Sequence, residues 1–137
     1  MIKALILCTG NSCRSQMAEG ILNSFLSNIK VYSAGTNPEK VNPFAIKVMS
    51  EIGIDISQNA SNHADEYANI DFDYVFTVCD YAKEICPIYP QAKQIIHHSF
   101  TDPAEATGTD QELLEVYIEV RDQLIDYFKA FAKNKLS

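Results

Sequence analysis

Residues 2–15 read IKALILCTGNSCRS. The stretch from Ile2 to Leu7 is almost entirely apolar, which predicts a short buried strand. Residues 9–12 are typical of turns, and the segment from about Ser15 to Asn28 then carries apolar side chains at helical spacing. A buried strand, a tight loop and a helix in this order are typical of the first unit of an α/β sheet.

The rest of the chain continues this alternation. Further strands are expected at residues 30–34, 72–79 and 94–98, and helices at residues 42–53 and about 110–133. Apolar strands that alternate with helices pair in parallel and are covered on both faces. The sequence therefore predicts an α/β fold with a parallel sheet and helices on both faces, in a single domain over residues 1–137.

The composition is that of a globular protein with an acidic surface. Of the 137 residues, 47% are hydrophobic and 21% are charged, and the formal net charge is -7. A negative field repels phosphate backbones and anionic headgroups, so we expect no nucleic acid and no membrane surface as a partner. The longest apolar run, Ala4 to Cys8, is too short for a membrane span or a secretory signal. We therefore expect a cytoplasmic protein with reduced cysteines.

The loop after the first strand combines a thiol with an arginine. Cys8 is followed by five residues, Arg14 and Ser15, and such a loop can wrap its N–H groups around a tetrahedral oxyanion. Gly10 permits a tight backbone, Asn11 tolerates the left-handed conformation, and Arg14 can bind two oxyanion oxygens. We expect a Cys8 thiolate that accepts a hydrogen bond from Ser15. The predicted oxyanion-binding loop comprises Thr9, Gly10, Asn11, Ser12, Cys13, Arg14 and Ser15; a Gly-Asn turn with two buried cysteines is the alternative.

Three reactive side chains follow the carboxyl ends of predicted strands. Cys8 and Cys79 follow the first and third strands, and Asp102 lies in the loop after the fourth. These ends meet at one edge of a parallel sheet, where ligands bind. Asp102 would be the general acid of an enzyme that attacks an oxyanion, whereas a turn-capping role before Pro103 is the alternative.

Residues 8–20, CTGNSCRSQMAEG, resemble the phosphate-binding signature of the low-molecular-weight protein tyrosine phosphatase superfamily. Within it, the chain most closely resembles the thioredoxin-coupled arsenate reductases. Further motifs occur in the order that this family shows, namely Val31 to Gly35, Val41 to Pro43, Ile54 to Ser57, Cys79 and Cys86 followed by Pro87, and Asp102 to Ala104. The resemblance covers nearly the whole chain and implies a four-stranded parallel sheet flanked by helices.

The resemblance implies that the chain is a catalytic domain that reduces arsenate to arsenite through a cysteine relay. Cys8 attacks arsenic, Arg14 binds the oxyanion, and Asp102 is the general acid. Cys79 then attacks Cys8, which releases arsenite and leaves a disulfide between the two cysteines. Cys86 attacks Cys79, and thioredoxin reduces the resulting disulfide without any further cofactor.

The spacing of Cys79 and Cys86 has a geometric consequence. Residues 80–86 are compatible with a helix in the reduced enzyme, which would separate the two cysteines by about 10 Å of axial rise. A disulfide needs Cα atoms within about 7 Å, so we expect this segment to loop outward on oxidation.

Cys13 and the paired histidines are not expected to act in catalysis. Cys13 is predicted to be structural and to face away from the anion if Cys8 faces it. His97 and His98 end the fourth strand, and adjacent strand residues point to opposite faces, so they are poor joint metal ligands.

A potassium site is implied for some of the resembling reductases. The matching positions in this chain are Asn11, Glu19 and Ser33, together with Asn62 where those proteins have an acid. Loss of this carboxylate removes a charged oxygen ligand, which argues against a potassium site here.

Two other functions fit parts of the sequence. A phosphoester hydrolase would use Cys8 and Asp102 and leave Cys79 and Cys86 without a role. Family members that hydrolyse phosphotyrosine usually have tyrosine after the Asp-Pro pair, where this chain has Ala104. A zinc-binding module could use the four cysteines but would leave the arginine and the acid unexplained. We expect a monomer in either enzyme class.

Overall fold

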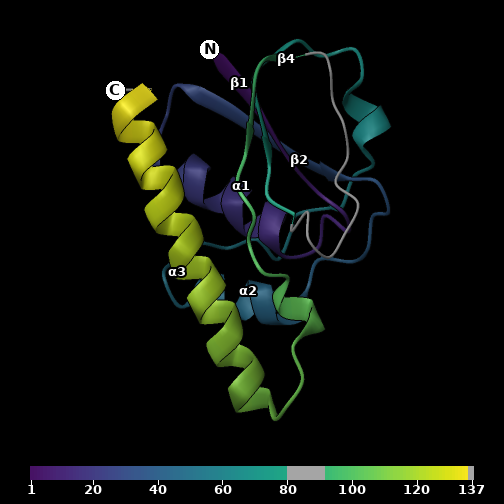
Figure 1. Cartoon of the computed structure of the whole chain (residues 1–137), viewed down its shortest axis with the longest axis vertical. Coiled ribbons are helices and arrows are strands. Elements are labelled where there is room, and N and C mark those ends of the chain that lie inside the picture. Colours follow the sequence, from purple (N-terminus) through teal and green to yellow (C-terminus); the bar gives the residue numbers. More distant parts are fainter. Residues whose placement is uncertain (80–91, 136–137) are drawn as a thin grey trace.

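The computed structural model describes residues 1–79 and 92–135. Its strands are β1 (Ile2–Cys8), β2 (Ile29–Gly35), β3 (Phe72–Thr77) and β4 (Ala92–His97), which form a parallel sheet in the order β2-β1-β3-β4 (Figure 1). The helices are α1 (Arg14–Phe25), α2 (Pro43–Ser50) and α3 (Asp110–Lys135), with short 3₁₀ helices η1 (Ala64–Tyr67) and η2 (Pro103–Glu105). The predicted four-stranded parallel sheet is therefore confirmed.

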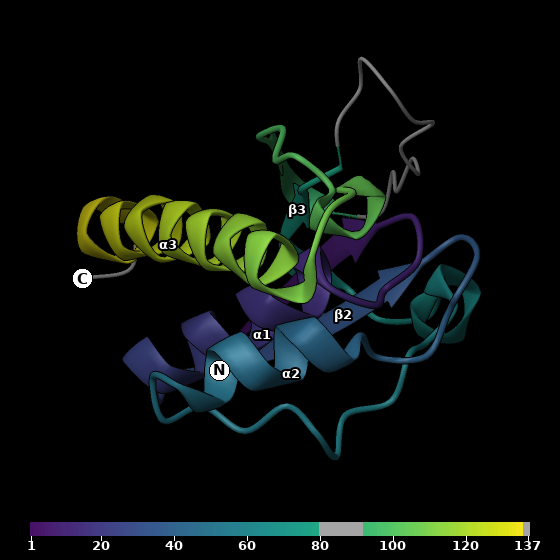
Figure 2. The same cartoon turned by 90° about the horizontal axis from the view of Figure 1, so that it is seen from below.

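The three α-helices pack together on one face of the sheet. Ala4 and Ile6 of β1 point to this face and share a buried cluster with Met17 of α1, Val48 of α2 and Leu124 of α3. Figure 2 shows α1 and α2 on the same side of α3, and both helices pack against it. This face holds the larger of the two buried clusters, and each fully buried large aliphatic side chain in it contributes roughly 1.5–3 kcal/mol.

The opposite face of the sheet is covered by the segment around η1. Leu5 and Leu7 of β1 point to this face and pack with Phe72. The ring of Tyr32 lies 5.0 Å from that of Tyr67 and 5.5 Å from that of Phe72, between centroids. Helices thus lie on both faces as predicted, but unequally, because the described part of this face carries only a 3₁₀ helix.

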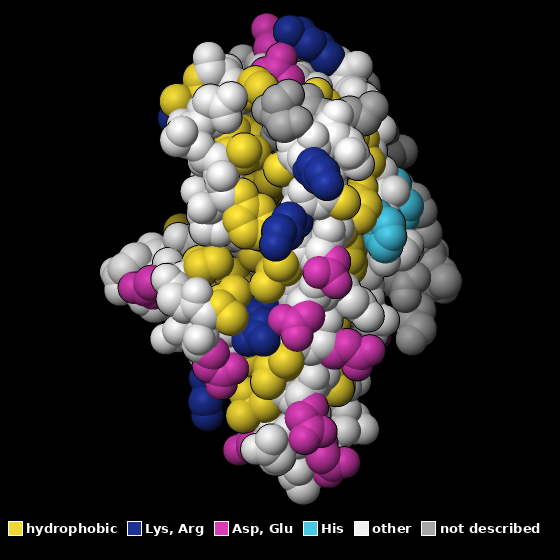
Figure 3. Space-filling model, turned by 90° about the vertical axis from the view of Figure 1, so that its left-hand side faces the viewer, with side chains coloured by type: hydrophobic (Ala, Val, Ile, Leu, Met, Phe, Trp, Pro, Cys, Tyr) yellow, Lys and Arg dark blue, Asp and Glu magenta, His cyan; other side chains and the backbone are white. Residues whose placement is uncertain are grey.

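The long helix α3 packs through an apolar stripe and presents charge on its other side. The ring of Phe128 is fully buried and lies 5.1 Å from that of Phe76 in β3. The Arg121 guanidinium donates to the Val48 carbonyl at 2.9 Å, which ties α3 to α2. Acidic residues occupy the first turn of α3, where the helix dipole favours negative charge. Figure 3 shows several acidic side chains together towards the lower end of this face.

The carboxyl ends of β1 and β3 lie side by side. Leu7 pairs with Thr77, and the Val78 N–H donates to the Leu7 carbonyl at 3.0 Å. Cys8 and Cys79 therefore follow adjacent strand ends, at the edge where parallel sheets bind ligands.

Candidate active site

Cys8 lies at the end of β1 and is buried within the loop that follows it. The Asn11 N–H donates to Cys8 Sγ at 3.3 Å, and the Ser15 hydroxyl lies 2.9 Å from the same sulfur. The Asn11 side-chain amide donates to Ser15 Oγ at 2.8 Å, which leaves the Ser15 hydrogen available to Cys8. Two hydrogen-bond donors therefore face the Cys8 sulfur.

Asn11 holds the sharpest turn of the loop. Its φ of 48° lies in the left-handed region, which asparagine tolerates better than most residues. Its side-chain oxygen accepts from the Asn62 N–H at 2.8 Å, and Gln16 donates to its main-chain carbonyl at 3.1 Å. The predicted left-handed residue is therefore confirmed, and bonds from distant segments hold it in place.

The segment at residues 37–42 hydrogen-bonds to the outside of the Cys8 loop. The N–H groups of Asn37, Glu39 and Asn42 donate to the carbonyls of Thr9, Gly10 and Ser12, at 3.0, 2.8 and 2.9 Å respectively. These bonds satisfy three loop acceptors, whose partial negative charge would otherwise oppose a bound anion. Nothing in the motif of residues 8–15 reveals this second layer, because it comes from another segment of the chain.

Gly35 is the glycine that the packed loop requires. A Cβ at Gly35 would stand 2.4 Å from the Thr9 carbonyl oxygen and 2.9 Å from that of Cys8. At Gly10, a Cβ would come no closer than 3.4 Å to any neighbour, and the φ of Gly10 is outside the left-handed region. The prediction that Gly10 permits the tight backbone is therefore wrong, since the steric constraint lies at Gly35 of β2.

Arg14 and Asp102 come together, as the sequence predicts. Arg14 begins α1, and its guanidinium is buried, donates to the Phe100 carbonyl at 3.2 Å and lies 3.5 Å from Asp102 Oδ2. Asp102 caps η2, where its Oδ1 accepts from the Ala104 N–H at 3.0 Å. An acid and a cation therefore face one another across the entrance to the Cys8 loop.

The Cys13 thiol does not face away from this site as predicted. Its sulfur donates to Asp102 Oδ1 at 3.5 Å. Burial raises the pKa of the Cys13 thiol to about 12, and the nearby Asp102 carboxylate acts in the same direction. Cys13 is therefore a protonated thiol that contacts the candidate general acid, rather than a second nucleophile.

A small pocket opens over Cys8. It encloses about 180 Å³, a size that suits a small tetrahedral oxyanion better than a bulky ester. The residues lining it are Cys8, Thr9, Gly10, Ser12, Cys13, Arg14, Asn37, Glu39, Asp102, Ala104 and Glu105. Of these, Asn37, Glu39 and Glu105 lie outside every motif identified in the sequence, and only the packing of their loops brings them here.

Cys79 is fully buried just beyond β3, in the same apolar cluster as Cys8. Cys8 and Cys13 are free thiols, whereas Cys79 is disulfide-bonded. Cys86 and the helix predicted for residues 80–86 lie outside the described residues.

The paired histidines lie outside the pocket over Cys8. His97 Nδ1 lies 2.6 Å from Thr77 Oγ1, and the His98 ring lies against Phe100 and Tyr127, so neither lines the pocket. In residues 1–79 and 92–135, no group of three or more His, Cys, Asp or Glu side chains could hold a metal ion.

Two of the three residues at the implied potassium positions, Glu19 and Asn11, already accept hydrogen bonds through their side-chain oxygens. Glu19 is buried enough to raise its pKa, and its Oε2 already accepts from the Asn59 amide at 3.0 Å. Asn62 turns its side-chain amide to the Ala60 carbonyl at 3.2 Å, and its N–H occupies the side-chain oxygen of Asn11. Amide donors thus occupy one side-chain oxygen each of Glu19 and Asn11, whereas the hydroxyl of Ser33 is buried and accepts from no amide of the described residues.

Comparison with known proteins finds relatives over almost the whole chain. A family model described as low molecular weight phosphotyrosine protein phosphatase matches residues 3–136. The chain belongs to this family. A protein of Halalkalibacterium halodurans named arsenate reductase is 48% identical over 128 residues, which cover 93% of this chain and 92% of that protein.

Solved structures agree with membership of this phosphatase family. A structure described as an arsenate reductase in the phosphate binding state matches with a TM-score of 0.81 at 32% identity and covers 96% of both chains. The thioredoxin-dependent arsenate reductase of Corynebacterium glutamicum matches with a TM-score of 0.65 at 25% identity, covering 98% of this chain and 64% of that one. The predicted family and fold are therefore confirmed.

Proposed function

We propose that this member of the phosphatase family is an arsenate reductase, and that residues 1–137 form its single catalytic domain. The observation that carries the proposal is the position of two cysteines at adjacent strand ends, with Cys8 under a pocket of oxyanion size and Cys79 in the same buried cluster. Relatives named arsenate reductase that cover more than nine-tenths of the chain support it. A phosphatase needs one nucleophilic cysteine and water, and so leaves Cys79 without a task.

The first step of the proposed reaction uses the pocket. The Cys8 thiolate attacks the arsenic of arsenate, an arsenic–sulfur bond forms, and one oxygen leaves as water. The Arg14 guanidinium and the loop N–H groups bind the other oxygens, and Asp102 supplies the proton to the departing oxygen. The contacts of Ser15 and Asn11 with the Cys8 sulfur support its role as the attacking thiolate.

The later steps move two electrons from thiols to arsenic. The Cys79 thiolate attacks Cys8 Sγ, the arsenic–sulfur bond breaks, and its electron pair leaves with arsenic as arsenite. A Cys8–Cys79 disulfide remains, and Cys86 attacks Cys79 to free Cys8. Thioredoxin then reduces the Cys79–Cys86 disulfide by two electrons. The disulfide at Cys79 supports a redox role for this residue.

The test is arsenate-dependent oxidation of NADPH with thioredoxin and thioredoxin reductase, measured beside hydrolysis of a small aryl phosphate by the same sample. We expect turnover with arsenate and thioredoxin and little hydrolysis. Hydrolysis without arsenate turnover would identify a phosphatase instead. A Cys86→Ser protein that turns over many times with thioredoxin would contradict the relay while leaving reductase activity in place.

Location and assembly complete the proposal. No helix in the described residues is long and apolar enough to cross a membrane. We infer a cytoplasmic location, since thioredoxin and reduced thiols belong to that compartment. We also propose that the protein is a monomer. Cell fractionation and sedimentation of the purified protein test the two points separately.

A further inference from the structure

The pocket over Cys8 has an unusual charge balance for an anion site. Among the described residues that line it, Arg14 is the only cation, whereas Glu39, Asp102 and Glu105 are carboxylic acids. A site built only to attract anions would place positive charge at its rim. The carboxylates at the rim of the pocket must therefore do something other than attract anions.

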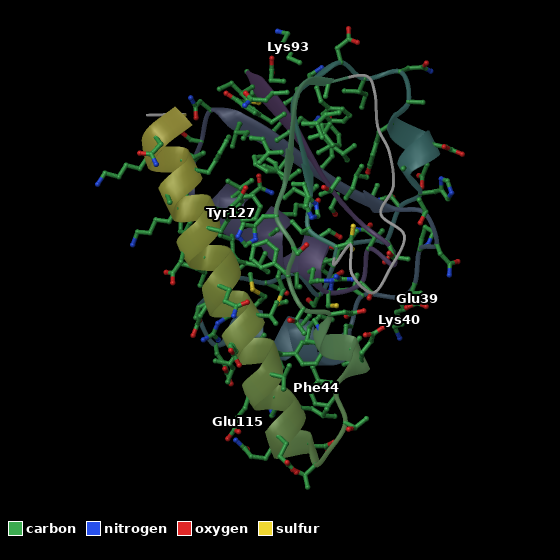
Figure 4. All side chains as sticks on the ribbon, viewed as in Figure 1. Glu39, Lys40, Phe44, Lys93, Glu115 and Tyr127 are labelled. Carbon is green, nitrogen blue, oxygen red and sulfur yellow. The ribbon has the colours of Figure 1, made fainter. Side chains whose placement is uncertain are left out.

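Glu39 is placed firmly at this rim. Its N–H donates to the Gly10 carbonyl at 2.8 Å, so its main chain is fixed to the oxyanion loop. Its Oε2 lies 3.4 Å from the point where a Cβ on Gly10 would stand, which puts the carboxylate beside the loop backbone at the pocket. The side chain is exposed, and Figure 4 shows it on the opposite side of the molecule from Glu115.

The Asp102 carboxylate is less available to a ligand than that of Glu39. Its Oδ1 accepts from Ala104 N–H and from the Cys13 thiol, and its Oδ2 faces Arg14. Glu39 reaches the pocket from a different segment, on the side formed by Gly10.

We propose that Glu39 is a specificity-determining residue that makes the pocket favour oxyanions carrying a proton over those carrying none. A carboxylate accepts a hydrogen bond from a protonated oxygen and repels an unprotonated one, which is discrimination by an unfavourable contact with the wrong ligand. Arsenate and phosphate keep at least one proton at neutral pH, whereas sulfate keeps none. The inference rests on the proposed function, because it assumes that oxyanions bind over Cys8.

The test measures how phosphate and sulfate protect Cys8 in the reduced protein. Iodoacetamide, which is uncharged and does not compete for an anion site, alkylates Cys8 at neutral pH, and peptide mapping reports the rate at this residue. Phosphate serves as the unreactive counterpart of arsenate. The half-protecting concentration of each anion is measured at constant ionic strength, in the parent protein and in Glu39→Gln. Glu115→Gln is the matched control, because it makes the same charge change on α3, away from the pocket.

We expect phosphate to protect at lower concentration than sulfate in the parent protein and in Glu115→Gln. In Glu39→Gln, the half-protecting concentration of sulfate divided by that of phosphate should fall by about three- to tenfold, because sulfate is no longer repelled and phosphate loses an acceptor. An unchanged ratio, with both anions still protecting Cys8, would overturn the role of Glu39 and leave the proposed function intact. Failure of both anions to protect the parent protein would overturn the proposed oxyanion site and this inference together.

Discussion

The two walls of the pocket are built differently. The Cys8–Ser15 wall is almost entirely buried, and its main chain is bonded to residues 37–42 and to Ser61, while the Asn11 side chain is bonded to Asn62. The wall at residues 100–105 is half-buried, and it is held against the first wall mainly by the side chains of Arg14 and Cys13. Binding therefore depends on a fixed backbone, whereas the candidate proton donor is positioned by side-chain contacts. Changes that displace the backbone of the first wall should harm folding and binding together, and side-chain changes in the second wall should slow the chemistry alone.

The largest expected effect on activity comes from removal of the nucleophile in the first wall. Cys8→Ser keeps a side chain of similar size but replaces the thiolate by a far weaker nucleophile. We expect arsenate-dependent oxidation of thioredoxin to fall to the background rate, while the free energy of unfolding changes little. Retained turnover in this variant would place the first attack on another cysteine. Cys13→Ser is the matched control in the same loop, and it should keep most of the turnover.

The second wall is tested by Asp102→Asn, which keeps the shape of the side chain and removes the transferable proton. The first chemical step should slow by about 10²–10⁴-fold, with phosphate protection of Cys8 nearly unchanged. A single-turnover measurement of arsenate consumption, quenched before thioredoxin is added, reports this step. Glu105→Gln changes the same charge on the same wall and should have a small effect. If the two variants behave alike, Asp102 has no special part in the chemistry.

The first wall is tested at Gly35. Because a Cβ there would overlap the Thr9 carbonyl, Gly35→Ala should lower the free energy of unfolding by about 2–4 kcal/mol and weaken oxyanion binding with it. Urea unfolding and Cys8 protection measure the two effects. Gly10→Ala is the control, because its Cβ would meet only side-chain atoms of Glu39 and Ser12, none closer than 3.4 Å. An equal loss in both variants would mean that the close approach at Gly35 carries no special cost.

The sequence predicted the fold well because its signals are local. The apolar run before Cys8 and the helical spacing after it are properties of one continuous segment, and the structure places β1 and α1 there. The imbalance between the two faces could not be foreseen, because covering of the second face depends on how the segment around Tyr67 packs.

The site was only partly predictable for the same reason. Residues 8–15 form a local motif, and the resemblance placed Asp102 beside it. The contact of Cys13 with Asp102 joins residues 89 positions apart, and it depends on a side-chain orientation that no spacing reveals. Glu39 was missed because an exposed acid in a loop carries no signal until its N–H is seen bonded to Gly10.

The smallest expected effect is on the stability of the protein at alkaline pH, through the contact of Cys13 with Asp102 that joins the two walls. In the folded protein the pKa of Cys13 is raised to about 12 from a usual value of 9.0, so the native state keeps a proton that the unfolded chain releases as pH rises. Stability is therefore fully present below pH 9 and is lost as pH rises towards 12, by up to about 1.4 kcal/mol per pH unit for this one proton. Burial also raises the pKa of Tyr117 to about 12, from 10.0, so Tyr117 adds a further, smaller loss that begins one pH unit higher.

Two variants separate these contributions. In Cys13→Ala, urea unfolding between pH 8 and 10 should show a shallower fall in stability above pH 9 than in the parent protein. In Tyr117→Phe, the fall between pH 9 and 10 should stay as in the parent and become shallower only above pH 10. The comparison uses slopes, because both substitutions also change packing by an amount that does not depend on pH. A parent-like slope between pH 9 and 10 in Cys13→Ala would mean that the Cys13 thiol is not held protonated against Asp102, and the second wall would then depend on Arg14 alone for its attachment to the loop.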